Sequence, residues 1–491
     1  MRASSYNIYV DLPGTDRHRL LLHGYTGAFD RVSVDVAEWV ESLETPSSAP
    51  LHGKWSGRRV PQGVTAPSDS VVSVLRRRGY LTDMTADAEF AYFERVVGAL
   101  RRRVQVPGYL VMPTYNCNLR CSYCFQDHLR SDPNRRHLLS TMPLSMVDRI
   151  FTAMSSIERQ IGLPDTQESH GPVGFFGGEP LLAASRPVVE HVMRRAQDRG
   201  QEGFYAVTNG TELDVYEDLL GPGRLDALQI TLDGPPAQHD ARRIYADGSG
   251  SFERIARNID LALDRGVDVH VRINVDRALL PSLPPLAQSF EDKGWFSRSN
   301  FVAYTAPIQP NSHVDRATTF TTLALDQALA RLREQYPIMH NVERPDDRLT
   351  NEIAGIFVER KQPQLDPTFC SAHNSSYIFD AFGNVFACWE KTGDANLRIG
   401  SVDQSGNYVP DPLGDLWRSR DVTTNAVCRR CRYALHCGGG CAVLAEGRTG
   451  TMFTNYCDGF ATRFKSEVAT AYSRRSAAPL PTPKLRQFAD L

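Results

Sequence analysis

The segment Pro113-Thr-Tyr-Asn-Cys117-Asn-Leu-Arg-Cys121-Ser-Tyr-Cys124-Phe-Gln decides how this chain is interpreted. It places three cysteines within eight residues, directly after an apolar run at 109–113 that predicts a strand. Three thiolates at this spacing can hold three irons of a [4Fe–4S] cube, whose usual complement is four cysteines. The fourth iron is then open to a substrate or cofactor. The alternative is a zinc loop that lacks one ligand, although structural zinc sites usually have four.

Strand and helix patterns alternate outward from this segment, between residues 106 and 315. The predicted strands cover 109–113, 172–176, 204–208, 227–232, 268–275 and 300–304. The predicted helices cover about 143–160, 185–199, 212–219 and 252–265. This alternation predicts a parallel sheet with crossover helices, and six strands are too few for an eight-stranded barrel. The predicted fold class is therefore α/β, with a partial (β/α)6 barrel whose chemistry lies at the carboxyl edge of the strands.

Polar motifs follow the later strands of this pattern. Gly177-Gly-Glu-Pro180 follows the second strand, Thr208-Asn-Gly210 the third and Thr231-Leu-Asp-Gly234 the fourth. Glycine permits close backbone approach, and the carboxylate of Glu179 can pair with an ammonium group. The short polar side chains of the other two motifs can reach hydroxyl or carboxylate groups of a ligand. The alternative is plain turn chemistry, which Asn-Gly and Asp-Gly favour in any protein.

Two arginine-containing motifs come next. His239-Asp-Ala-Arg-Arg243 follows the fourth strand, and Arg272-Ile-Asn-Val275 lies on the fifth. The guanidinium of Arg243 can bind a carboxylate through two parallel hydrogen bonds. The alternative for Arg243 is a solvated surface arginine. His239 and Asp240 are expected to be structural rather than catalytic.

The composition limits the possible functions. The chain has 491 residues, 41% hydrophobic and 23% charged, which excludes a disordered or collagen-like protein. A formal net charge of −2 gives no basic surplus for nucleic acid, and no run of about 18 apolar residues predicts a membrane span. The first residues lack the apolar region of a signal peptide, so we expect a cytoplasmic protein. In that reducing compartment, ten cysteines indicate metal binding or catalysis more than disulfides.

The cysteines divide the chain into regions, because none lies before 117 and none between 124 and 370. Residues 1–105 combine short strand patterns with helical patterns and predict a small α+β, winged-helix-like module. Ser33 is the expected N-cap of its first helix. The other predicted regions are a partial barrel at 106–315, two bridging helices at 316–362, a cysteine-rich domain at 363–470 and a proline-rich, extended tail at 471–491.

The cysteine-rich domain has a specific spacing of its seven cysteines. They are Cys370, Cys388, Cys428, Cys431, Cys437, Cys441 and Cys457. The run Cys-x2-Cys-x5-Cys-x3-Cys at 428–441 is far more specific than a lone Cys-x2-Cys. Two zinc ribbons are the alternative, but two four-ligand zinc sites need eight ligands, so a histidine would have to join the cysteines.

The first cysteine segment resembles the radical S-adenosylmethionine (SAM) superfamily. Its Cys-x3-Cys-x-aromatic-Cys motif is matched by Cys117, Cys121, Tyr123 and Cys124, and the β/α repeat after it matches too. The resemblance implies that these cysteines hold a [4Fe–4S] cluster whose open iron binds SAM. It also implies that one electron cleaves SAM to methionine and a 5′-deoxyadenosyl radical, which removes a substrate hydrogen. The implied cofactor-binding residues are Tyr123, Gly177, Gly178, Glu179, Thr208, Asn209, Thr231, Asp233, Arg243 and Asn274.

The second cysteine set resembles the SPASM domain, a C-terminal extension of radical enzymes that modify peptides. The resemblance covers residues 106 to 470 and implies two auxiliary [4Fe–4S] clusters. The implied ligands are Cys370, Cys388 and Cys441 for the first auxiliary cluster, and Cys428, Cys431, Cys437 and Cys457 for the second. The first auxiliary cluster then has one iron that is open, or that is closed by a side chain such as Glu390 or His373.

The resemblance also separates two kinds of SPASM enzyme. Sulfatase-maturing members carry an Asp directly after the cysteine matched by Cys388 and a further cysteine shortly after the one matched by Cys370. Here Trp389 follows Cys388, and no cysteine follows Cys370 closely, since Ser375, Ser376 and Tyr377 occupy that region. These departures favour a maturase of ribosomally made peptides, which forms crosslinks or oxidises or epimerises residues.

Partners follow from this interpretation. The module at 1–105 is expected to bind the leader of a precursor peptide by adding a strand to a sheet edge, or else to cap the barrel. The expected electron donor is a flavodoxin or ferredoxin. One alternative is a SPASM enzyme that acts on another protein, a sugar or a small molecule, and a distant one is a non-catalytic iron–sulfur redox protein. No catalytic residue of the chain is assigned.

Overall fold

The computed structural model describes residues 1–44, 63–310, 314–344 and 347–475. Backbone contacts divide these residues into two compact units, each of which is described by itself. The barrel unit comprises residues 104–310, 314–344 and 374–418. The terminal unit comprises residues 1–44, 63–103, 347–373 and 419–475.

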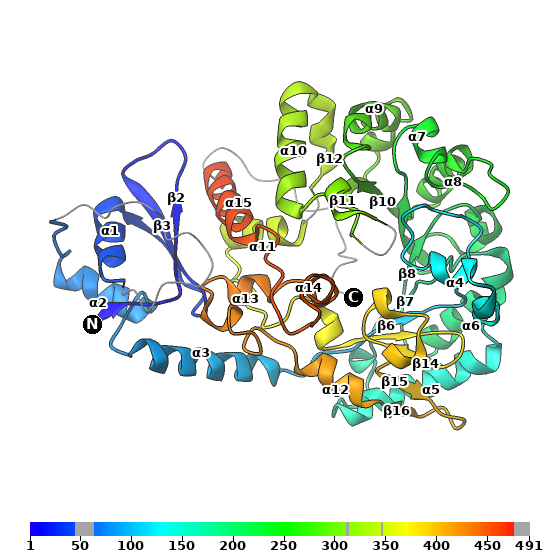
Figure 1. Ribbon diagram of the computed structural model, residues 1–491, viewed down its shortest axis with the longest axis horizontal. Coiled ribbons are helices and arrows are strands. Elements are labelled where there is room, and N and C mark those ends of the chain that lie inside the picture. Colours follow the sequence, from blue (N-terminus) through cyan, green and yellow to red (C-terminus); the bar gives the residue numbers. More distant parts are fainter. Residues whose placement is uncertain (45–62, 311–313, 345–346, 476–491) are drawn as a thin grey trace. The chain divides into compact units, whose positions relative to one another are not determined.

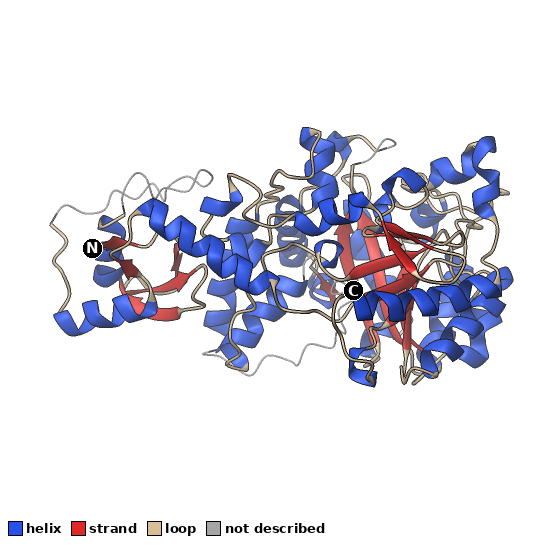
Figure 2. Cartoon of the chain, turned by 90° about the horizontal axis from the view of Figure 1, so that it is seen from below, coloured by secondary structure: helices blue, strands red, loops and turns tan. Residues whose placement is uncertain are grey.

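An 11-stranded sheet forms the core of the barrel unit, with helices packed around it (Figure 2). Its barrel strands pair in parallel and in chain order: β6 (Gly108–Val111), β7 (Val173–Phe175), β8 (Phe204–Thr208), β9 (Leu225–Thr231), β10 (Asp268–Val275) and β11 (Phe301–Pro307). The further strands are β12 (Val342–Glu343), parallel to β11, β13 (Ser376–Phe379), parallel to β6, and the antiparallel β14 (Asn384–Phe386), β15 (Gly400–Val402) and β16 (Tyr408–Pro410). The predicted α/β fold with a partial parallel barrel is confirmed.

Crossover helices connect the strands, as the alternating pattern requires. The main ones are α5 (Leu144–Gln160), α6 (Arg186–Gln197), α8 (Phe252–Asp264), α9 (Leu283–Asp292) and α10 (Thr322–Gln335), and α12 (Pro412–Ser419) follows β16. The sequence pattern did not predict α9, whose second and third residues are both proline. Proline is tolerated in a first helical turn because the amide there needs no helical partner. The predicted helix at 212–219 is a 3₁₀ helix at Leu213–Leu219.

The terminal unit begins with two small sheets and three helices, which belong to the blue end of the chain in Figure 1. Strands β2 (Asn7–Asp11), β3 (His18–His23) and β4 (Phe29–Ser33) form an antiparallel sheet in that order, and β1 (Arg2–Ala3) pairs with β5 (Leu81–Thr82). The helices are α1 (Val34–Ser42), α2 (Asp69–Arg78) and α3 (Ala86–Arg101). Ser33 caps α1 as expected, because its hydroxyl accepts a hydrogen bond from the Val36 amide at 3.4 Å. These are the strands and helices expected of a small α+β module.

This module shares its hydrophobic core with segments from the other end of the chain. One buried cluster joins Ile8 and Leu22 to Ile353 of α11 (Asp347–Val358) and to Phe464 and Val468 of α15 (Phe460–Arg475). A second cluster joins the α3 side of the module to the segment that carries Cys428. Its main members are Tyr6, Phe90, Phe93, Val422, Cys428 and Leu435.

One change of compact unit, between residues 103 and 104, lies close to the boundary predicted at 105, whereas the units do not change at the boundaries predicted at 362 and 470. Those boundaries rest on composition, whereas a compact unit is defined by packing between segments that lie far apart in the sequence. Of the two predicted bridging helices, α10 belongs to the barrel unit and α11 to the terminal unit. Helix α15 continues to Arg475, so the predicted extended tail does not begin at 471, and its remainder at 476–491 lies outside the described residues.

The rest of the terminal unit consists of short helices around the cysteine-rich segment, α13 (Ala434–Cys437) and α14 (Ala442–Thr449).

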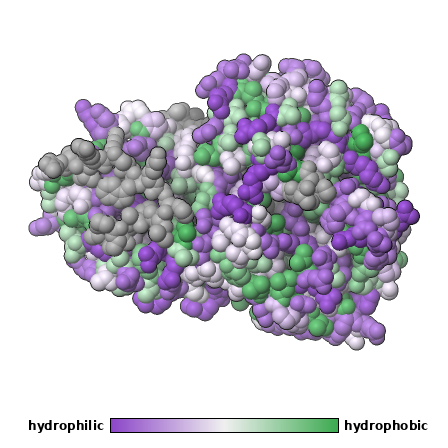
Figure 3. All heavy atoms as spheres, viewed as in Figure 1, coloured by the Kyte–Doolittle hydropathy of each residue, from purple (hydrophilic) through white to green (hydrophobic). Residues whose placement is uncertain are grey.

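Polar and apolar residues are interspersed over the visible face of the molecule (Figure 3). Within the described ranges, no helix combines the length and the apolar character needed to cross a membrane.

Candidate active site and cysteine clusters

The first three cysteines lie on the loop between β6 and α4 (Asp127–Ser131), at the carboxyl edge of the sheet. Cys117, Cys121 and Cys124 are all half-buried and free of disulfides. The Cys124 amide donates to the Cys121 carbonyl at 3.1 Å, and the Arg120 amide donates to the Ile244 carbonyl at 2.7 Å. Hydrogen bonds therefore hold the loop against the segment that follows β9.

Gly178, in the motif after β7, lies directly against this loop. Its amide donates to the Thr114 carbonyl at 3.1 Å, and the Glu179 amide donates to the Asn116 carbonyl at 2.8 Å. A Cβ at position 178 would lie 2.3 Å from the carbonyl oxygens of Tyr115 and Asn116. Glycine is therefore required here, because any side chain would push the cysteine loop away.

Glu179 is buried, with 2% of its surface exposed, and its carboxylate connects the segments that follow β7 and β8. Its Oε1 accepts hydrogen bonds from Thr208 Oγ1 at 2.6 Å and from the Leu181 amide at 2.9 Å, and its Oε2 accepts one from the Asn209 amide at 2.6 Å. Burial raises the pKa of Glu179 to about 7, although these hydrogen bonds oppose the change. The carboxyl group thus fixes the loop after β8 beside the cysteine loop.

Asn209 faces the cysteines from that same loop. Its Nδ2 donates to Asn118 Oδ1 at 2.8 Å and lies 3.7 Å from Cys117 Sγ. Its Oδ1 accepts a hydrogen bond from the Thr211 amide at 2.9 Å. The side-chain amide is therefore held in one orientation beside a cysteine thiol.

One hydrogen-bond network joins the buried Asp233 and Arg243 to the half-buried Tyr123 and Asn274. The Tyr123 hydroxyl donates to Asp233 Oδ2 and accepts from Arg243 Nη1 at 2.7 Å and from Asn274 Nδ2 at 3.1 Å. The Asn274 amide donates to Asp233 Oδ1 at 2.8 Å. Burial raises the pKa of Tyr123 well above its ordinary value, so the phenol stays protonated. The structure thus brings together four residues that the sequence places on separate segments.

His239 supports this network from behind. Its Nδ1 accepts a hydrogen bond from the Asp233 amide at 3.1 Å, and its Nε2 lies 3.0 Å from Ser251 Oγ. Burial lowers the pKa of His239 well below its ordinary value, so the ring is neutral. Its buried contacts agree with the structural role expected for it. Of the other predicted residues, Thr231 ends β9 and Gly177 follows β7 by two positions.

The segment after Cys388 lies at the same edge of the sheet, which the sequence did not indicate. Trp389 stacks on Phe176 with ring centroids 5.7 Å apart. Burial raises the pKa of Glu390 to about 7, and the charges of Arg272 and Lys391 oppose that rise. Glu390 and Trp389 therefore lie near the ends of β10 and β7, close to the predicted cofactor residues.

In the terminal unit, Cys431, Cys437 and Cys457 lie near enough to Cys428 for their charges to act on it. Burial raises the pKa of Cys428, and the nearby Cys437, Cys431 and Cys457 raise it further. Burial also raises the pKa of Cys431 to about 11, with Cys457 contributing in the same direction. Cys370 and Cys441 belong to the same unit, and Cys388 belongs to the barrel unit.

Arg420 is buried among the cysteines of the terminal unit, with 3% of its surface exposed. Its Nε donates to the Met452 carbonyl at 2.6 Å, and its Nη2 donates to the Gly440 carbonyl at 3.0 Å and to the Thr454 carbonyl at 3.2 Å. Its Nη1 lies 3.3 Å from His373 Nε2. Burial lowers its pKa, whereas the cysteines of both implied auxiliary sets raise it. These cysteines are Cys370, Cys428, Cys441 and Cys437.

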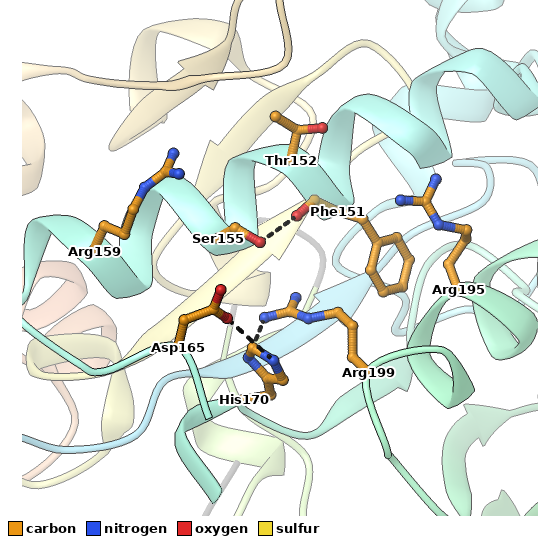
Figure 4. A pocket seen from close by; sticks show the side chains of 8 residues that line it. All are labelled: Phe151, Thr152, Ser155, Arg159, Asp165, His170, Arg195 and Arg199. Atoms are coloured by element: carbon orange, nitrogen blue, oxygen red, sulfur yellow. Dashed lines mark hydrogen bonds and ion pairs between the residues drawn. The ribbon is translucent and has the colours of Figure 1, made fainter. Parts of the chain in front are cut away.

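A separate pocket of about 300 Å³ lies on the outer helices of the barrel unit. Asp165 and Arg199 point toward His170 in this pocket, whereas Arg159 stands apart (Figure 4). His170 shortly precedes β7, so the pocket belongs to the amino edge of the sheet. It is therefore on the edge opposite the cysteine loop.

The residues at the carboxyl edge fit an iron–sulfur cluster. Burial raises the pKa of the Cys117 thiol to about 12, so a bound cation is needed to hold it as a thiolate at neutral pH. The buried guanidinium of Arg130 leaves two of its nitrogens without a hydrogen-bond partner among the described residues. Across the same residues, no three Cys, His, Asp or Glu side chains converge as the ligands of a single metal ion do. A [4Fe–4S] cube instead takes one cysteine per iron.

The fold and this edge define an α/β partial-barrel protein with a three-cysteine cluster loop. The family described as "Radical SAM superfamily" matches residues 111–278. The cysteine-type anaerobic sulfatase-maturating enzyme of Clostridium novyi is 30% identical over 372 residues, which cover 72% of this chain and 93% of that enzyme. The chain therefore belongs to the radical SAM superfamily, with a SPASM-type architecture. This membership implies a [4Fe–4S] cluster and SAM.

Two further comparisons describe its neighbours. The GTP 3′,8-cyclase of Corynebacterium glutamicum is 24% identical over 326 residues, covering 62% of this chain and 77% of that enzyme. The solved structure "Native anSMEcpe with bound AdoMet" is 16% identical with a TM-score of 0.54, and the likeness covers 76% of this chain and 100% of that one. At this identity the likeness concerns the fold alone.

Proposed function

We propose that this chain is a maturase that uses SAM to modify a residue of a ribosomally made precursor peptide. When bound, the reduced cluster supplies the electron that cleaves SAM to a 5′-deoxyadenosyl radical, which removes a hydrogen from the substrate. The main observation that supports a peptide substrate is the module at the start of the chain. It presents a strand edge beside a groove.

The groove lies between β4 and α2 and has a volume of about 300 Å³. Among the described residues, β4 pairs on one side only, with β3. Asp30 and Val32 line the groove from the strand, and Val71 and Val74 line it from the helix. A leader peptide in extended conformation would pair with β4 and place alternate side chains against α2.

The carboxyl edge of the barrel would hold the cofactor in this proposal. Cys117, Cys121 and Cys124 would ligate the cluster, and Arg243 would face the carboxylate of SAM. Glu179 already accepts three hydrogen bonds from the protein, so an ammonium contact would use its remaining lone pair. The other residues proposed to line the cofactor are Tyr123, Gly177, Gly178, Thr208, Asn209, Thr231, Asp233 and Asn274.

We propose two auxiliary [4Fe–4S] clusters in addition. Cys428, Cys431, Cys437 and Cys457 would hold one, which agrees with their proximity in the terminal unit. Cys370, Cys441 and Cys388 would supply three ligands to the other, leaving one iron open or closed by a group other than cysteine. The proposed reductant is a flavodoxin or ferredoxin.

A second candidate function is sulfatase maturation, which the 30% identity to the Clostridium novyi enzyme favours. Another solved structure of the same fold, "Native anSMEcpe with bound AdoMet and Cp18Cys peptide", holds a peptide, so peptide substrates occur in this fold. Against sulfatase maturation, Trp389 stands where those enzymes carry an aspartate. The two functions differ in substrate, so they can be separated directly.

The test is mass spectrometry of candidate peptides after anaerobic co-expression with the chain. The peptides are the product of any short open reading frame found beside the gene and a peptide carrying a sulfatase motif. A mass change in the precursor alone supports the proposal, and formylglycine in the sulfatase peptide alone contradicts it.

Val74→Asp in the groove is expected to raise KM for the precursor at least about tenfold without changing SAM cleavage in the absence of peptide. Val409→Asp, at a valine of β16 with 46% exposure against 45% for Val74, is the matched control.

A further inference from the structure

Arg130 lies beside the cysteine loop, outside the cysteine motif itself. It belongs to α4, directly after the loop, and its side chain is 2% exposed. Its Nη2 donates a hydrogen bond to Cys124 Sγ at 3.2 Å. The same nitrogen lies 3.6 Å from Asp127 Oδ1, which is too far for a hydrogen bond. The thiol is therefore the principal partner of this guanidinium.

Two other nitrogens of Arg130, Nε and Nη1, are buried and have no hydrogen-bond partner among the described residues. Across the described residues of both units, five other arginines each leave one buried nitrogen unpartnered, and only Arg130 leaves two. A buried charged group without partners is costly, because it loses its hydration and gains no hydrogen bond in return. The arrangement therefore indicates an acceptor that joins the protein after folding.

The hydrogen bond of Arg130 identifies the kind of acceptor. Its partner, Cys124 Sγ, lies on the loop between β6 and α4 that also carries Cys117 and Cys121. The guanidinium thus lies beside the loop whose three thiols would surround the cluster. Sulfur atoms of an iron–sulfur cluster accept hydrogen bonds, and those bonds help to set its reduction potential.

We propose that Arg130 is a positioning residue for the radical SAM cluster: its Nε and Nη1 donate hydrogen bonds to cluster sulfurs, and its charge makes the cluster easier to reduce. The inference rests on the proposed assignment of the cluster to Cys117, Cys121 and Cys124. It adds a residue outside the cysteine motif that favours the reduced state from which SAM is cleaved.

The carboxylate of SAM is another anion that a guanidinium could bind. The structure favours the cluster, because Arg130 hydrogen-bonds a cysteine thiol, whereas Arg243 belongs to the network of Tyr123, Asp233 and Asn274. The two possible acceptors, the cluster and the SAM carboxylate, lead to different expected results. A cluster contact changes the potential before SAM is added, and a SAM contact changes only SAM affinity.

The first experiment measures the reduction potential in the full-length, anaerobically reconstituted chain. The radical cluster is identified as the one whose electron paramagnetic resonance signal changes when SAM is added. Arg130→Met is expected to lower the equilibrium constant for reduction of this cluster about tenfold, which is about 59 mV for one electron. Arg130→Lys keeps the charge but loses the planar guanidinium with its several N–H donors. The reduction potential of this variant is expected to lie between those of Arg130→Met and the wild type. Arg120→Gln is the control, because Arg120 lies on the same loop but is exposed and donates to the Cys117 carbonyl at 2.7 Å.

An unchanged potential in Arg130→Met would overturn the inference, and weaker SAM binding at unchanged potential would assign Arg130 to the cofactor instead. A wild-type chain without any SAM-responsive cluster would refute the proposed function itself, and the inference would fall with it. If the wild-type chain holds a SAM-responsive cluster and Arg130→Met leaves its reduction potential unchanged, the inference about Arg130 is refuted and the proposed function is not.

The second experiment uses the full-length chain before reconstitution and does not require the variant to take up iron. Without the cluster, Arg130 keeps two unpartnered buried nitrogens, so Arg130→Met is expected to raise the urea midpoint of the cluster-free chain. A merely structural arginine would lower that midpoint when removed. A lowered midpoint would therefore contradict the inference even if the variant never binds a cluster.

Discussion

Two buried arginines lie beside cysteines in this chain, and their hydrogen bonds differ. Arg420, in the terminal unit, donates to four backbone carbonyls and lies 3.3 Å from His373 Nε2. Arg130, in the barrel unit, donates to a single cysteine sulfur and leaves two buried nitrogens unpartnered among the described residues. The fold alone satisfies Arg420, whereas Nε and Nη1 of Arg130 have no acceptor among the described residues.

The difference indicates how each cysteine region is built. Arg420 connects the segments at 373, 440 and 452–454, so it stabilises the cysteine-rich segment whether or not clusters are bound. Arg130 contributes little to folding and is available to the cluster. The residue at the radical site is therefore predicted to affect redox chemistry, and the residue at the auxiliary site is predicted to affect stability.

The largest expected effect separates the two cysteine regions. Replacing Cys117, Cys121 and Cys124 with Ala is expected to remove about four of about 12 irons per chain and all SAM cleavage. The double variant Cys428→Ala/Cys431→Ala is expected to lose iron but to keep SAM cleavage in the absence of substrate. Iron analysis and detection of 5′-deoxyadenosine measure both results. Full cleavage in the triple variant would show that the radical cluster lies elsewhere.

The next effect compares the two arginines directly. Arg420→Met is expected to lower the stability of the cluster-free chain by about 4 kcal/mol, because it leaves several buried acceptors unpaired at about 1–3 kcal/mol each. Arg130→Met is expected to shift stability in the opposite direction. Urea unfolding of both variants measures this, with Arg120→Gln as the control. Equal losses of stability in both variants would remove the distinction between the two arginines.

A pH effect is expected at the radical site. Burial raises the pKa of Glu179 from 4.5 to about 7, so the folded chain favours the protonated carboxyl. An acid whose pKa is raised by folding contributes stability at low pH and loses it as pH rises from about 4.5 to about 7, here by up to about 3 kcal/mol. Glu179→Gln is expected to abolish this part of the pH dependence in cluster-free protein. Parallel stability curves for wild type and variant from pH 4 to 8 would contradict this prediction.

The smallest effect concerns orientation within the cofactor network. Tyr123→Phe removes the hydroxyl that joins Asp233, Arg243 and Asn274. We expect a loss of about 1 kcal/mol in SAM binding, or roughly fivefold in affinity, with iron content unchanged. Calorimetric titration with SAM measures it, and Tyr92→Phe, at an exposed tyrosine of α3, is the control. An unchanged affinity would show that Arg243 is held without Tyr123.

Much of the barrel was predictable from local patterns. The predicted strands at 204–208 and 268–275 have the observed bounds, because both are short segments rich in β-branched or aromatic residues, in a mainly apolar or an alternating pattern. Helix α9 was missed because its two early prolines suggest a break rather than a start. The shared core of the terminal unit could not be predicted, since Leu22, Ile353 and Phe464 are too far apart in the sequence for any periodicity to connect them.

The sequence by itself determined the cysteine spacing, the strand–helix alternation and the polar turns, because each depends on residues within a few positions of one another. Only the tertiary structure decided which compact unit each cysteine joins, and that Tyr123 meets Asp233, Arg243 and Asn274. It also distinguished Arg130 and Arg420 from the other arginines. In a sequence they look alike, because burial and hydrogen-bond partners are set by packing between distant segments.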